Sequence, residues 1–458
     1  MAVWSVVPLS QFEYSRIDAD FYHPAYLKEL QSWRRVNARI GVAKLGHIIE
    51  APVRTGRTPK SRHVKKDETC IRFIKTDTVR EGSVDFDNSA LLPVRVISER
   101  DRIPNDAIVL TIIGATPEIV GRAAIVRPSD PECVTNQNVA VIRTGLKCDP
   151  YYLTAFFQTR WGRDQVWRHS RRTEQVNLNC REVERVLVPN PPQSIQEAIG
   201  SLVRDSFVSS DQSLARFQEA QQLLDSALGL DKLTFQKPVG YTTSLSEIEV
   251  SRRFDSERYF PAFGAFRAGL PNNISLSALS NDLVFCKRGK QPSYSKTGLP
   301  VINSRHIQPN RVLLDGNRRA RPNPDANLQI RFGEILLNGT GRGTIGRAAP
   351  YLSEELAVPD NHVTILRSRR LDPAYLSLYL NSAAGQMQVE MLQRGSSGQL
   401  ELYPLDIRKL LVWFAPDDFQ KEIRRLHDLA AALERKSRSL LEQAKLRVEQ
   451  LIEEAVQP

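Results

Sequence analysis

The sequence predicts an α+β protein made of two similar halves, each a mixed α/β domain followed by a long helix. Short motifs occur twice along the 458 residues, in the same order and about 224 residues apart. Each half has short runs rich in Val and Ile, bounded by Gly, Pro, Asn or Asp, which are typical of strands. Each half also ends in a stretch with an apolar residue at every third or fourth position, which is typical of a coiled-coil helix.

The repeated motifs indicate an internal duplication. Residues 120–124, Val-Gly-Arg-Ala-Ala, return as residues 345–349, Ile-Gly-Arg-Ala-Ala. Residues 149–153, Asp-Pro-Tyr-Tyr-Leu, return as residues 372–376, Asp-Pro-Ala-Tyr-Leu. Several matches in one order at nearly one offset are hard to obtain by chance. Two similar halves suit a target with two similar halves, and duplex DNA is the commonest target of that kind.

Composition bounds the class of protein. The net charge is +11, and an excess of Lys and Arg favours a polyanionic partner. Five cysteines, an odd number without CxxC spacing, argue against disulfides and against a Cys-rich zinc site. The N-terminus has no basic segment followed by an apolar one, and the longest apolar run, residues 107–115, is too short to span a membrane. We therefore expect a cytoplasmic protein with no membrane partner.

Each half follows the same order of elements. An aromatic and acidic opening, residues 15–24 or 254–261, precedes a Gly-basic-x-Pro turn at residues 56–59 or 289–292. The expected strands then follow at residues 71–74, 108–113 and 139–142, and at residues 301–302, 335–337 and 363–366. A helix should begin at Asp149-Pro150 and at Asp372-Pro373, because Asp is a good N-cap and Pro suits the first helical position.

A long helix is predicted at about residues 193–229 and another at about 417–456. The apolar positions of the second run through Phe419, Ile423, Leu426, Ala430 and Leu433, then Leu440, Ala444 and Leu451, with Ser437 at the skipped position. Those of the first run through Ile195 and Ile199, then Val203, Phe207, Leu214, Phe217, Leu224 and Leu228. Roughly 35 residues make about 50 Å of helix, longer than a small domain is wide, so coiled-coil pairing is expected. The predicted organisation is a domain at 1–190, a central long helix at 191–230, a linker at 231–244, a domain at 245–415 and a C-terminal long helix at 416–458.

Motifs that would indicate catalysis are weak or missing. Residues 341–346 match GxGxxG, but Pro350 follows too early for the helix that a dinucleotide site needs, so we interpret them as a turn between two strands. Asn190-Pro191-Pro192-Gln193 lacks the aromatic residue on which amino-group DNA methyltransferases stack a base. The seven histidines show no metal-ligand spacing, and neither GxxxxGK[ST] nor GxSxG occurs. We expect a binding protein with no catalytic residues and no metal site.

Basic loops are the candidates for contact with nucleic acid. Residues 54–66 contain six Lys and Arg with no acid, and further arginines lie in loop-like sequence of the second half. The candidate DNA-binding residues are Lys60, Arg62, Lys75, Arg171 and Arg172 in the first half, and Lys290, Lys296, Arg305, Arg342 and Arg394 in the second.

Together these residues make the chain resemble the specificity (S) subunit of type I restriction-modification systems, or an S-like subunit of a related methylation-based phage-defence system. Residues 189–196, Pro-Asn-Pro-Pro-Gln-Ser-Ile-Gln, are similar to the family's Pro-x-Pro-Pro-x-x-x-Gln. Residues 71–77 and 299–305 resemble the start of its recognition domains, and residues 175–178 and 399–402 resemble the segment before the last strand. The resemblance spans nearly the whole chain, although the second half lacks the Pro-Pro pair.

The resemblance implies two target recognition domains separated by a pair of long antiparallel coiled-coil helices, with each domain reading half of a bipartite duplex DNA site. It implies that the chain itself does no chemistry. Adenine DNA methyltransferase subunits, two of them, would dock on the helices, and ATP-dependent translocase or nuclease subunits would join where the system cleaves DNA. S-adenosylmethionine and ATP would then belong to partner subunits. The helix residues expected to serve these contacts are Ile195, Ile199, Leu214, Phe217, Phe419, Ile423, Leu426 and Leu433.

Two other classes stay open from the residues alone. The chain could be a DNA methyltransferase or nuclease with unfamiliar motifs, which would bind a cofactor by itself. It could also be an RNA-binding or scaffold subunit of another phage-defence complex, which would prefer RNA over duplex DNA.

Overall fold

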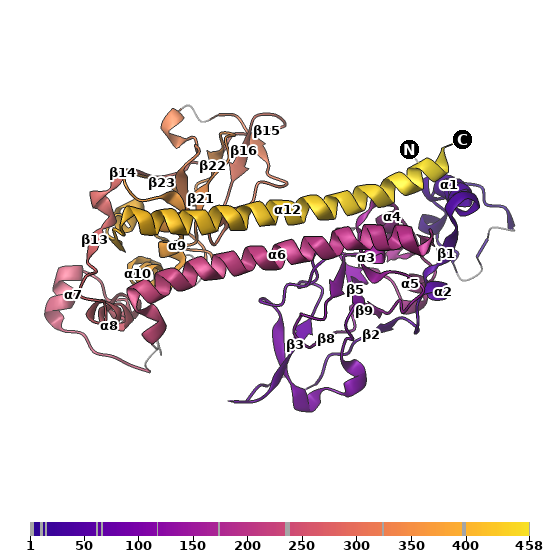
Figure 1. The fold of residues 1–458 in the computed structure, drawn as a ribbon, viewed down its shortest axis with the longest axis horizontal. Helices are drawn as coiled ribbons and strands as arrows, with labels where there is room; N and C mark the ends of the chain where they lie inside the picture. The colour runs from indigo at the N-terminus through magenta and orange to yellow at the C-terminus, as the bar shows by residue number, and fades with distance from the viewer. Residues whose placement is uncertain are drawn as a thin grey trace. The chain divides into compact units, whose positions relative to one another are not determined.

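The computed structural model describes residues 4–9, 12–13, 16–60, 63–65, 67–116, 118–172, 175–233, 239–322, 325–395 and 400–457. They form two compact units, Met1–Ser210 with Glu434–Pro458, and Asp211–Leu433. Both units contain helices and sheets, and the long helix α6 (Gln193–Leu228) lies between the two sheet-rich parts of the sequence (Figure 1). The predicted α+β class is confirmed, while the domain boundaries drawn along the sequence stay a prediction.

Among its described residues, the first unit contains five short helices and the twelve strands β1 to β12. The helices are α1 (Pro24–Ile40), α2 (Leu45–Ile48), α3 (Pro150–Gln158), α4 (Arg160–His169) and α5 (Cys180–Glu184). The strands are β1 (Val42–Lys44), β2 (Arg54–Thr55), β3 (Cys70–Ile74), β4 (Ala90–Pro93), β5 (Ala107–Thr111), β6 (Ile113–Gly114), β7 (Ala123–Val126), β8 (Cys133–Thr135), β9 (Val139–Ile142), β10 (Arg171–Arg172), β11 (Val176–Asn177) and β12 (Leu187–Pro189). They form sheets in the orders β2-β9-β5-β7, β4-β3-β8, β10-β11-β6 and β1-β12.

The second unit repeats this plan. Its short helices are α7 (Leu245–Ser251), α8 (Ala262–Ala268), α9 (Pro373–Asn381), α10 (Ala383–Leu392) and α11 (Pro404–Ile407). Its strands are β13 (Leu276–Ala278), β14 (Leu283–Arg288), β15 (Tyr294–Ser295), β16 (Leu299–Ile302), β17 (Ile307–Gln308), β18 (Arg311–Val312), β19 (Arg319–Ala320), β20 (Glu334–Asn338), β21 (Ala348–Tyr351), β22 (Val358–Pro359), β23 (Val363–Ser368) and β24 (Leu411–Trp413). The sheet orders are β14-β23-β20-β21, β15-β19-β16-β22, β13-β24 and β17-β18.

The duplication read from the sequence is confirmed by this topology. The antiparallel sheet β2-β9-β5-β7 corresponds to β14-β23-β20-β21, and the pair β1-β12 corresponds to β13-β24. Each unit also has one parallel pair, β3 with β8 and β16 with β22, inside a small mixed sheet. The larger sheets therefore match in order and in direction, and the small mixed sheet of the second unit has the additional edge strand β15.

The GxGxxG segment is a connection between strands, as the sequence analysis expected. It joins the antiparallel neighbours β20 and β21. Gly346 has φ +81, and a Cβ there would lie 2.8 Å from Val389. Its counterpart Gly121 has φ +93, with Val166 at 3.0 Å. Glycine is needed at both turns because the backbone is left-handed and a helix passes close by.

A capped helix joins each unit to its long helix. Asp149 accepts hydrogen bonds from the first backbone N–H groups of α3, at 2.9 and 2.8 Å, and Asp372 does the same for α9, at 2.8 and 3.3 Å. The two aspartates are thus N-caps, as predicted. The Asp149 N–H donates to Oε1 of Gln196 at 3.1 Å, and the Asp372 N–H donates to Oε1 of Gln420 at 2.7 Å.

The same two glutamines also bind the short segment between the preceding strand and the long helix. Nε2 of Gln196 donates to the Pro191 carbonyl at 2.9 Å, and Nε2 of Gln420 donates to the Ala415 carbonyl at 2.9 Å. Both side chains are almost fully buried. Each glutamine therefore connects its own long helix with two other segments. Its amide oxygen accepts from the N-cap aspartate of the short helix, and its amide nitrogen donates to the segment before the long helix.

An arginine closes the end of another helix in each unit; Arg16 is buried and Arg253 is mostly buried. Arg16 donates to the His169 carbonyl at 2.7 Å and to the Ser170 carbonyl at 3.2 Å, at the end of α4. Arg253 donates to the carbonyls of Met391, Leu392 and Gln393, at 3.2, 3.2 and 2.6 Å, at the end of α10. Each arginine is paired with the aspartate two residues later, and its hydrogen bond lowers the pKa of that carboxyl. An arginine suits this place because helix ends leave carbonyls without partners.

The core of each unit includes part of both long helices, α6 and α12 (Asp417–Val456). In the first unit the buried residues are Ile199 and Val203 of α6, with Ala444, Val448, Ile452 and Ala455 of α12. In the second unit they are Ala220, Leu224 and Leu228 of α6, with Ile423 and Leu426 of α12. A segment far away in the sequence therefore completes each core.

Hydroxyl groups and small side chains form part of the contact between the helices. In the first unit Ser206 Oγ lies 3.0 Å from Ser437 Oγ. In the second unit Ser213 donates to the Ala430 carbonyl at 2.8 Å, and the rings of Phe217 and His427 are 5.6 Å apart. Because the partner number falls as the α6 number rises, the helices run antiparallel there.

Three positions of the expected seam lie outside it. Ile195 and Leu214 are 38% and 58% exposed, and Ser213, next to Leu214, is buried instead. Leu451 is only half-buried, whereas Val448 and Ile452 are buried. The register changes because α12 packs there into the core of the first unit and not only along α6. Among the described residues, no helix combines the length and apolar character that a membrane span requires.

The junction predicts a local loss of stability when its glutamine is removed. Gln420→Ala would leave the Asp372 N–H and the Ala415 carbonyl without their partner, at a cost of about 2 kcal/mol. Hydrogen–deuterium exchange at the start of α9 should become faster. Lys421→Ala, which removes only an exposed ion pair with Asp418, is the control and should leave this exchange unchanged. Equal exchange in the two variants would contradict the assigned role of the amide.

His169 makes the stability of the first unit depend on pH. Burial, followed by the charges of Arg168 and Arg16, lowers the pKa of His169 from 6.5 to about 3. Below pH 6.5 the unfolded chain thus binds a proton that the folded chain does not. The free energy of unfolding therefore decreases as the pH is lowered, by about 2 kcal/mol from pH 7 to pH 5.

His169→Leu tests this dependence, since Leu392 occupies the equivalent end of α10 in the second unit. The variant should lose less stability than the wild type between pH 7 and pH 5. Urea unfolding followed by tryptophan fluorescence measures it, because four of the five tryptophans lie in the first unit. The same loss in variant and wild type would show that His169 becomes protonated in the folded unit.

Candidate nucleic-acid interface

Two glycine turns stand at equivalent places in the units. A Cβ at Gly56 would lie 1.9 Å from the Thr135 carbonyl oxygen, and a Cβ at Gly289 would lie 2.2 Å from that of Asp360. Only glycine allows so close an approach of two backbones. Each glycine therefore lies directly against the backbone at the end of β8 or just after β22, immediately before a basic segment.

Four of the predicted DNA-binding cations are exposed and form no ion pair with any residue that the structure describes: Lys60, Lys290, Lys296 and Arg342. Arg62 lies outside the described residues. Arg305 is exposed as well, and its Nε lies 3.1 Å from Nε2 of His306. Burial lowers the pKa of His306 to about 4, so the ring is uncharged at neutral pH. Arg305 is then the one positive charge of this pair of side chains.

Two predicted cations of the first unit have acidic neighbours. Lys75 Nζ lies 3.5 Å from Asp77, in a surface pair that contributes little. Arg172 lies 3.4 Å from Asp20, donates to the Tyr26 hydroxyl at 2.7 Å and stands over the Trp167 ring at 5.0 Å. These contacts bind Arg172 to its own unit.

Arg171 and Arg394 occupy equivalent places, and each is paired with a buried carboxylate. Arg171 Nε lies 2.7 Å from Glu182 in α5, and Arg394 Nε lies 3.0 Å from Asp406 in α11. Burial raises the pKa of Asp406, but hydrogen bonds from Lys409 and Arg394 outweigh it and keep the pKa below its ordinary value. The two arginine side chains are 53% and 51% exposed. Each therefore binds a buried carboxylate of its own unit and is also accessible to solvent.

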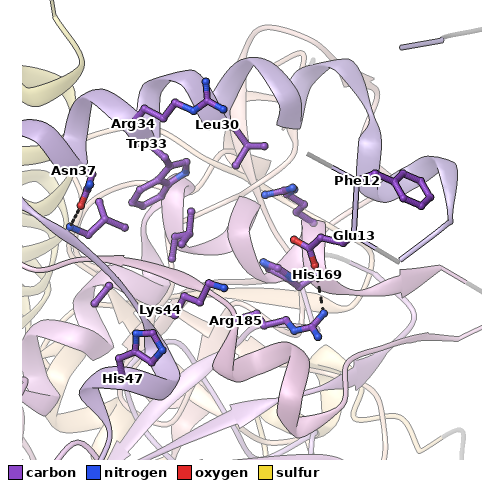
Figure 2. A pocket seen from close by; sticks show the side chains of 14 residues that line it. Phe12, Glu13, Leu30, Trp33, Arg34, Asn37, Lys44, His47, His169 and Arg185 are labelled. Atoms are coloured by element: carbon purple, nitrogen blue, oxygen red, sulfur yellow. Dashed lines mark hydrogen bonds and ion pairs between the residues drawn. The ribbon is translucent and has the colours of Figure 1, made fainter. Parts of the chain in front are cut away.

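A pocket of about 770 Å³ opens in the first unit, between α1, β1 and α4. Figure 2 shows Arg34, Lys44 and Arg185 among its lining residues, with Arg185 directed at Glu13, 3.4 Å away. His169 also lines it, with Nδ1 buried and without a hydrogen-bond partner among the described residues. The lining thus holds several cations and one acid, which suits an anionic group.

The thiols that lie deepest are unsuited to act as nucleophiles. Burial raises the pKa of Cys133 and Cys148 to about 12 and that of Cys286 to about 11, so they stay protonated at neutral pH. In the described parts of the chain, no three His, Cys, Asp or Glu side chains are grouped to hold a metal ion.

The helix residues predicted to meet partners fall into three groups. Ile199, Ile423 and Leu426 are buried, Phe217, Phe419 and Leu433 are half-buried, and Ile195 and Leu214 are exposed. The buried residues pack in the cores of their own units. Ile195 and Leu214, 38% and 58% exposed, are the members of the set that a partner helix can reach without any change in this chain.

One arginine that sequence reasoning did not select is unusually placed. The Arg318 guanidinium carbon lies 3.4 Å from the centre of the Tyr294 ring. The two residues are far apart in the sequence, so no local pattern indicated the pair. The sequence shows a cluster of arginines around residue 318, but nothing in it distinguishes Arg318 from the neighbouring arginines.

No family model matches the chain. In sequence it is 22% identical over 405 residues to the type I restriction enzyme EcoKI specificity subunit of Escherichia coli (strain K12), with 84% of this chain and 82% of that protein covered.

Solved structures give lower similarity. The HsdS subunit from Thermoanaerobacter tengcongensis is 14% identical, with 90% of this chain and 96% of that chain covered and a TM-score of 0.29. The type I restriction-modification S subunit from M. genitalium is 10% identical, with 92% and 97% covered and a TM-score of 0.41. Both TM-scores lie below 0.5, so the sequence relative carries the comparison. That relative supports the resemblance read from the motifs: this chain is similar over most of its length to the specificity subunit of a type I restriction enzyme.

Proposed function

We propose that this chain reads a bipartite site on duplex DNA, with one half-site per unit, and so directs an adenine DNA methyltransferase to that site. The observation that carries the proposal is the duplicated fold. The two units have matching sheets, glycine turns, capped helices and arginine-closed helix ends. A protein with two similar units suits a target that is itself two half-sites.

The basic loops supply the electrostatic part of this binding. The net charge is +11, and exposed cations without acidic partners among the described residues occur in both units. Contacts with phosphates raise affinity for any sequence, while a few side chains that reach base edges give specificity. Arg171, Arg172 and Arg394 are partly engaged within the protein, so the free cations are the stronger candidates for phosphate contacts.

The chemistry of the complex belongs to partner subunits in this proposal. Two adenine methyltransferase subunits would bring S-adenosylmethionine, and translocase or nuclease subunits of a cleaving complex would bring ATP. Exposed apolar residues on the long helices support such docking: Ile195 and Leu214 on α6, and Leu429 and Leu446 on α12. Exposed apolar side chains on a helix suit packing against a partner helix. The complex would act in the cytoplasm, where the chromosomal DNA is.

Salt dependence tests the binding part of the proposal. The isolated chain should bind duplex DNA weakly and gain affinity and specificity when the methyltransferase subunit is added. The logarithm of the binding constant should fall with the logarithm of salt, with a slope near −0.9 for each phosphate contacted. Fluorescence anisotropy with a labelled duplex measures this, and an RNA of the same sequence is the control. Salt-independent binding, tighter binding of the RNA, or methyl transfer by the chain alone would count against the proposal.

Exchange of one unit tests the claim of two independent readers. Residues 1–190 are replaced by the same region of a homologous subunit, and methylated sites are mapped in DNA exposed to the complete complex. Only one half-site should change, because the second unit and its cations are untouched. The reciprocal exchange of residues 245–415 should change only the other half-site. If either exchange alters both half-sites, or neither, the units do not read independently.

A further inference from the structure

The small mixed sheet of the second unit carries an exposed aromatic residue beside an exposed arginine. This sheet has the order β15-β19-β16-β22 (β15, β16 and β22 are labelled in Figure 1). Tyr294 in the edge strand β15 is 38% exposed. The guanidinium of Arg318 stands over its ring, 3.4 Å from the centre. Among the described residues, no carboxylate pairs with Arg318.

The backbone holds this arginine in place. The Arg318 carbonyl accepts from the Val301 N–H at 2.8 Å, and the Asn317 side chain donates to the Val301 carbonyl at 2.9 Å. Tyr294 is paired with Ala320, two residues beyond Arg318. Side chains two apart along a strand lie on one face of a sheet, and long ones reach diagonally across to the neighbouring strand. The stack therefore follows from the register of β15 and β19.

The next residue, Arg319, is used differently. It donates to the Gly298 carbonyl at 2.6 Å and pairs with Glu355 at 3.2 Å. Because neighbouring side chains in a strand point to opposite faces, Arg319 holds the loop before β16 while Arg318 stays on the other face. Two adjacent arginines thus provide a matched pair: Arg319 is bound within the unit, whereas the Arg318 guanidinium donates no hydrogen bond to any residue that the structure describes.

The first unit has no equivalent of this stack. Its parallel pair aligns Ile74 with Thr135, as the second unit aligns Ile302 with Pro359. Counting along the paired strands from there places Ala90 of β4 where the second unit has Arg318. The scaffold of the sheet is therefore shared, whereas this side chain is particular to one unit. A residue that reads a base should differ in this way when the two half-sites differ.

We propose that Arg318 is a specificity-determining residue of the second unit, and that its guanidinium, held over the Tyr294 ring, reads a guanine in the major groove. The proposal rests on the proposed function. Guanine offers O6 and N7, the two acceptors that match the donor fork of arginine. The exposed cations Lys290, Lys296 and Arg321, close to Tyr294 or Arg318 in the sequence, are candidates for the accompanying phosphate contacts.

A base contact fits this arginine better than a phosphate contact does. A phosphate can be bound by a flexible cation from many directions, whereas a base edge must be met in its plane. The contact with the Tyr294 ring restricts the guanidinium, while Arg318 as a whole stays exposed.

The experiment uses the complete complex with its methyltransferase subunits and maps methylated sites with the wild type and four variants. Arg318→Ala should relax a single position of the second half-site, with the preference for guanine there falling roughly 5- to 150-fold. Arg318→Lys should relax the same position, because it keeps the charge but not the fork. Tyr294→Leu should weaken the preference in part. Arg319→Ala should keep the base preference of the wild type at every position.

Other outcomes overturn the inference. Equal loss at all sites with Arg318→Ala, rescue by Arg318→Lys and a salt slope reduced by about 0.9 would identify a phosphate contact. Unchanged sites with Arg318→Ala would show that the stack only packs on the surface. Thermal unfolding of each variant checks that the second unit is folded. If the wild-type complex itself methylates without sequence preference, the proposed function fails; if it is specific and Arg318→Ala is not altered, only this inference fails.

Discussion

Each unit depends on one glutamine that binds a capped helix to a long one. Gln196 and Gln420 accept from the N-cap aspartates Asp149 and Asp372 and donate to the short segment before the long helix. A buried amide with both ends satisfied allows little movement, since a broken hydrogen bond there leaves unpaired polar groups. The direction in which α6 and α12 leave their units is set at this point. The cores that receive the helices, and the sheets that carry the basic loops, are built around it.

The two units share their buried polar contacts, whereas their exposed side chains differ. Arg16 and Arg253 close equivalent helix ends, and Arg171 and Arg394 meet equivalent buried acids. Loss of one member of such a contact is costly, because the other stays buried without a partner. Exposed side chains such as Arg318 carry no such cost, so the surface can change while the fold stays. A protein whose specificity must vary on a constant scaffold benefits from this division.

Several buried ionisable groups are kept uncharged or paired. His169 stays neutral because burial and two arginines oppose its protonation, and the deep thiols of Cys133 and Cys148 stay protonated. Such groups suit packing better than proton transfer at neutral pH. The cations Lys60, Lys290, Lys296 and Arg342, by contrast, are exposed at the surface. Charge in that position acts on a partner and not within the fold.

The sequence by itself determined the features that depend on local or repeated patterns. The duplication, the aspartate caps followed by proline, the glycine turns and the two long helices all follow from residues close together in the chain. Only the tertiary structure decided which residues meet across long separations. It placed residues 434–458 in the first unit, buried Ser213 in place of Leu214, and set Arg171 and Arg394 on buried acids. It also brought Arg318 onto Tyr294, because strand register, which no short sequence pattern encodes, decides which side chains share a face.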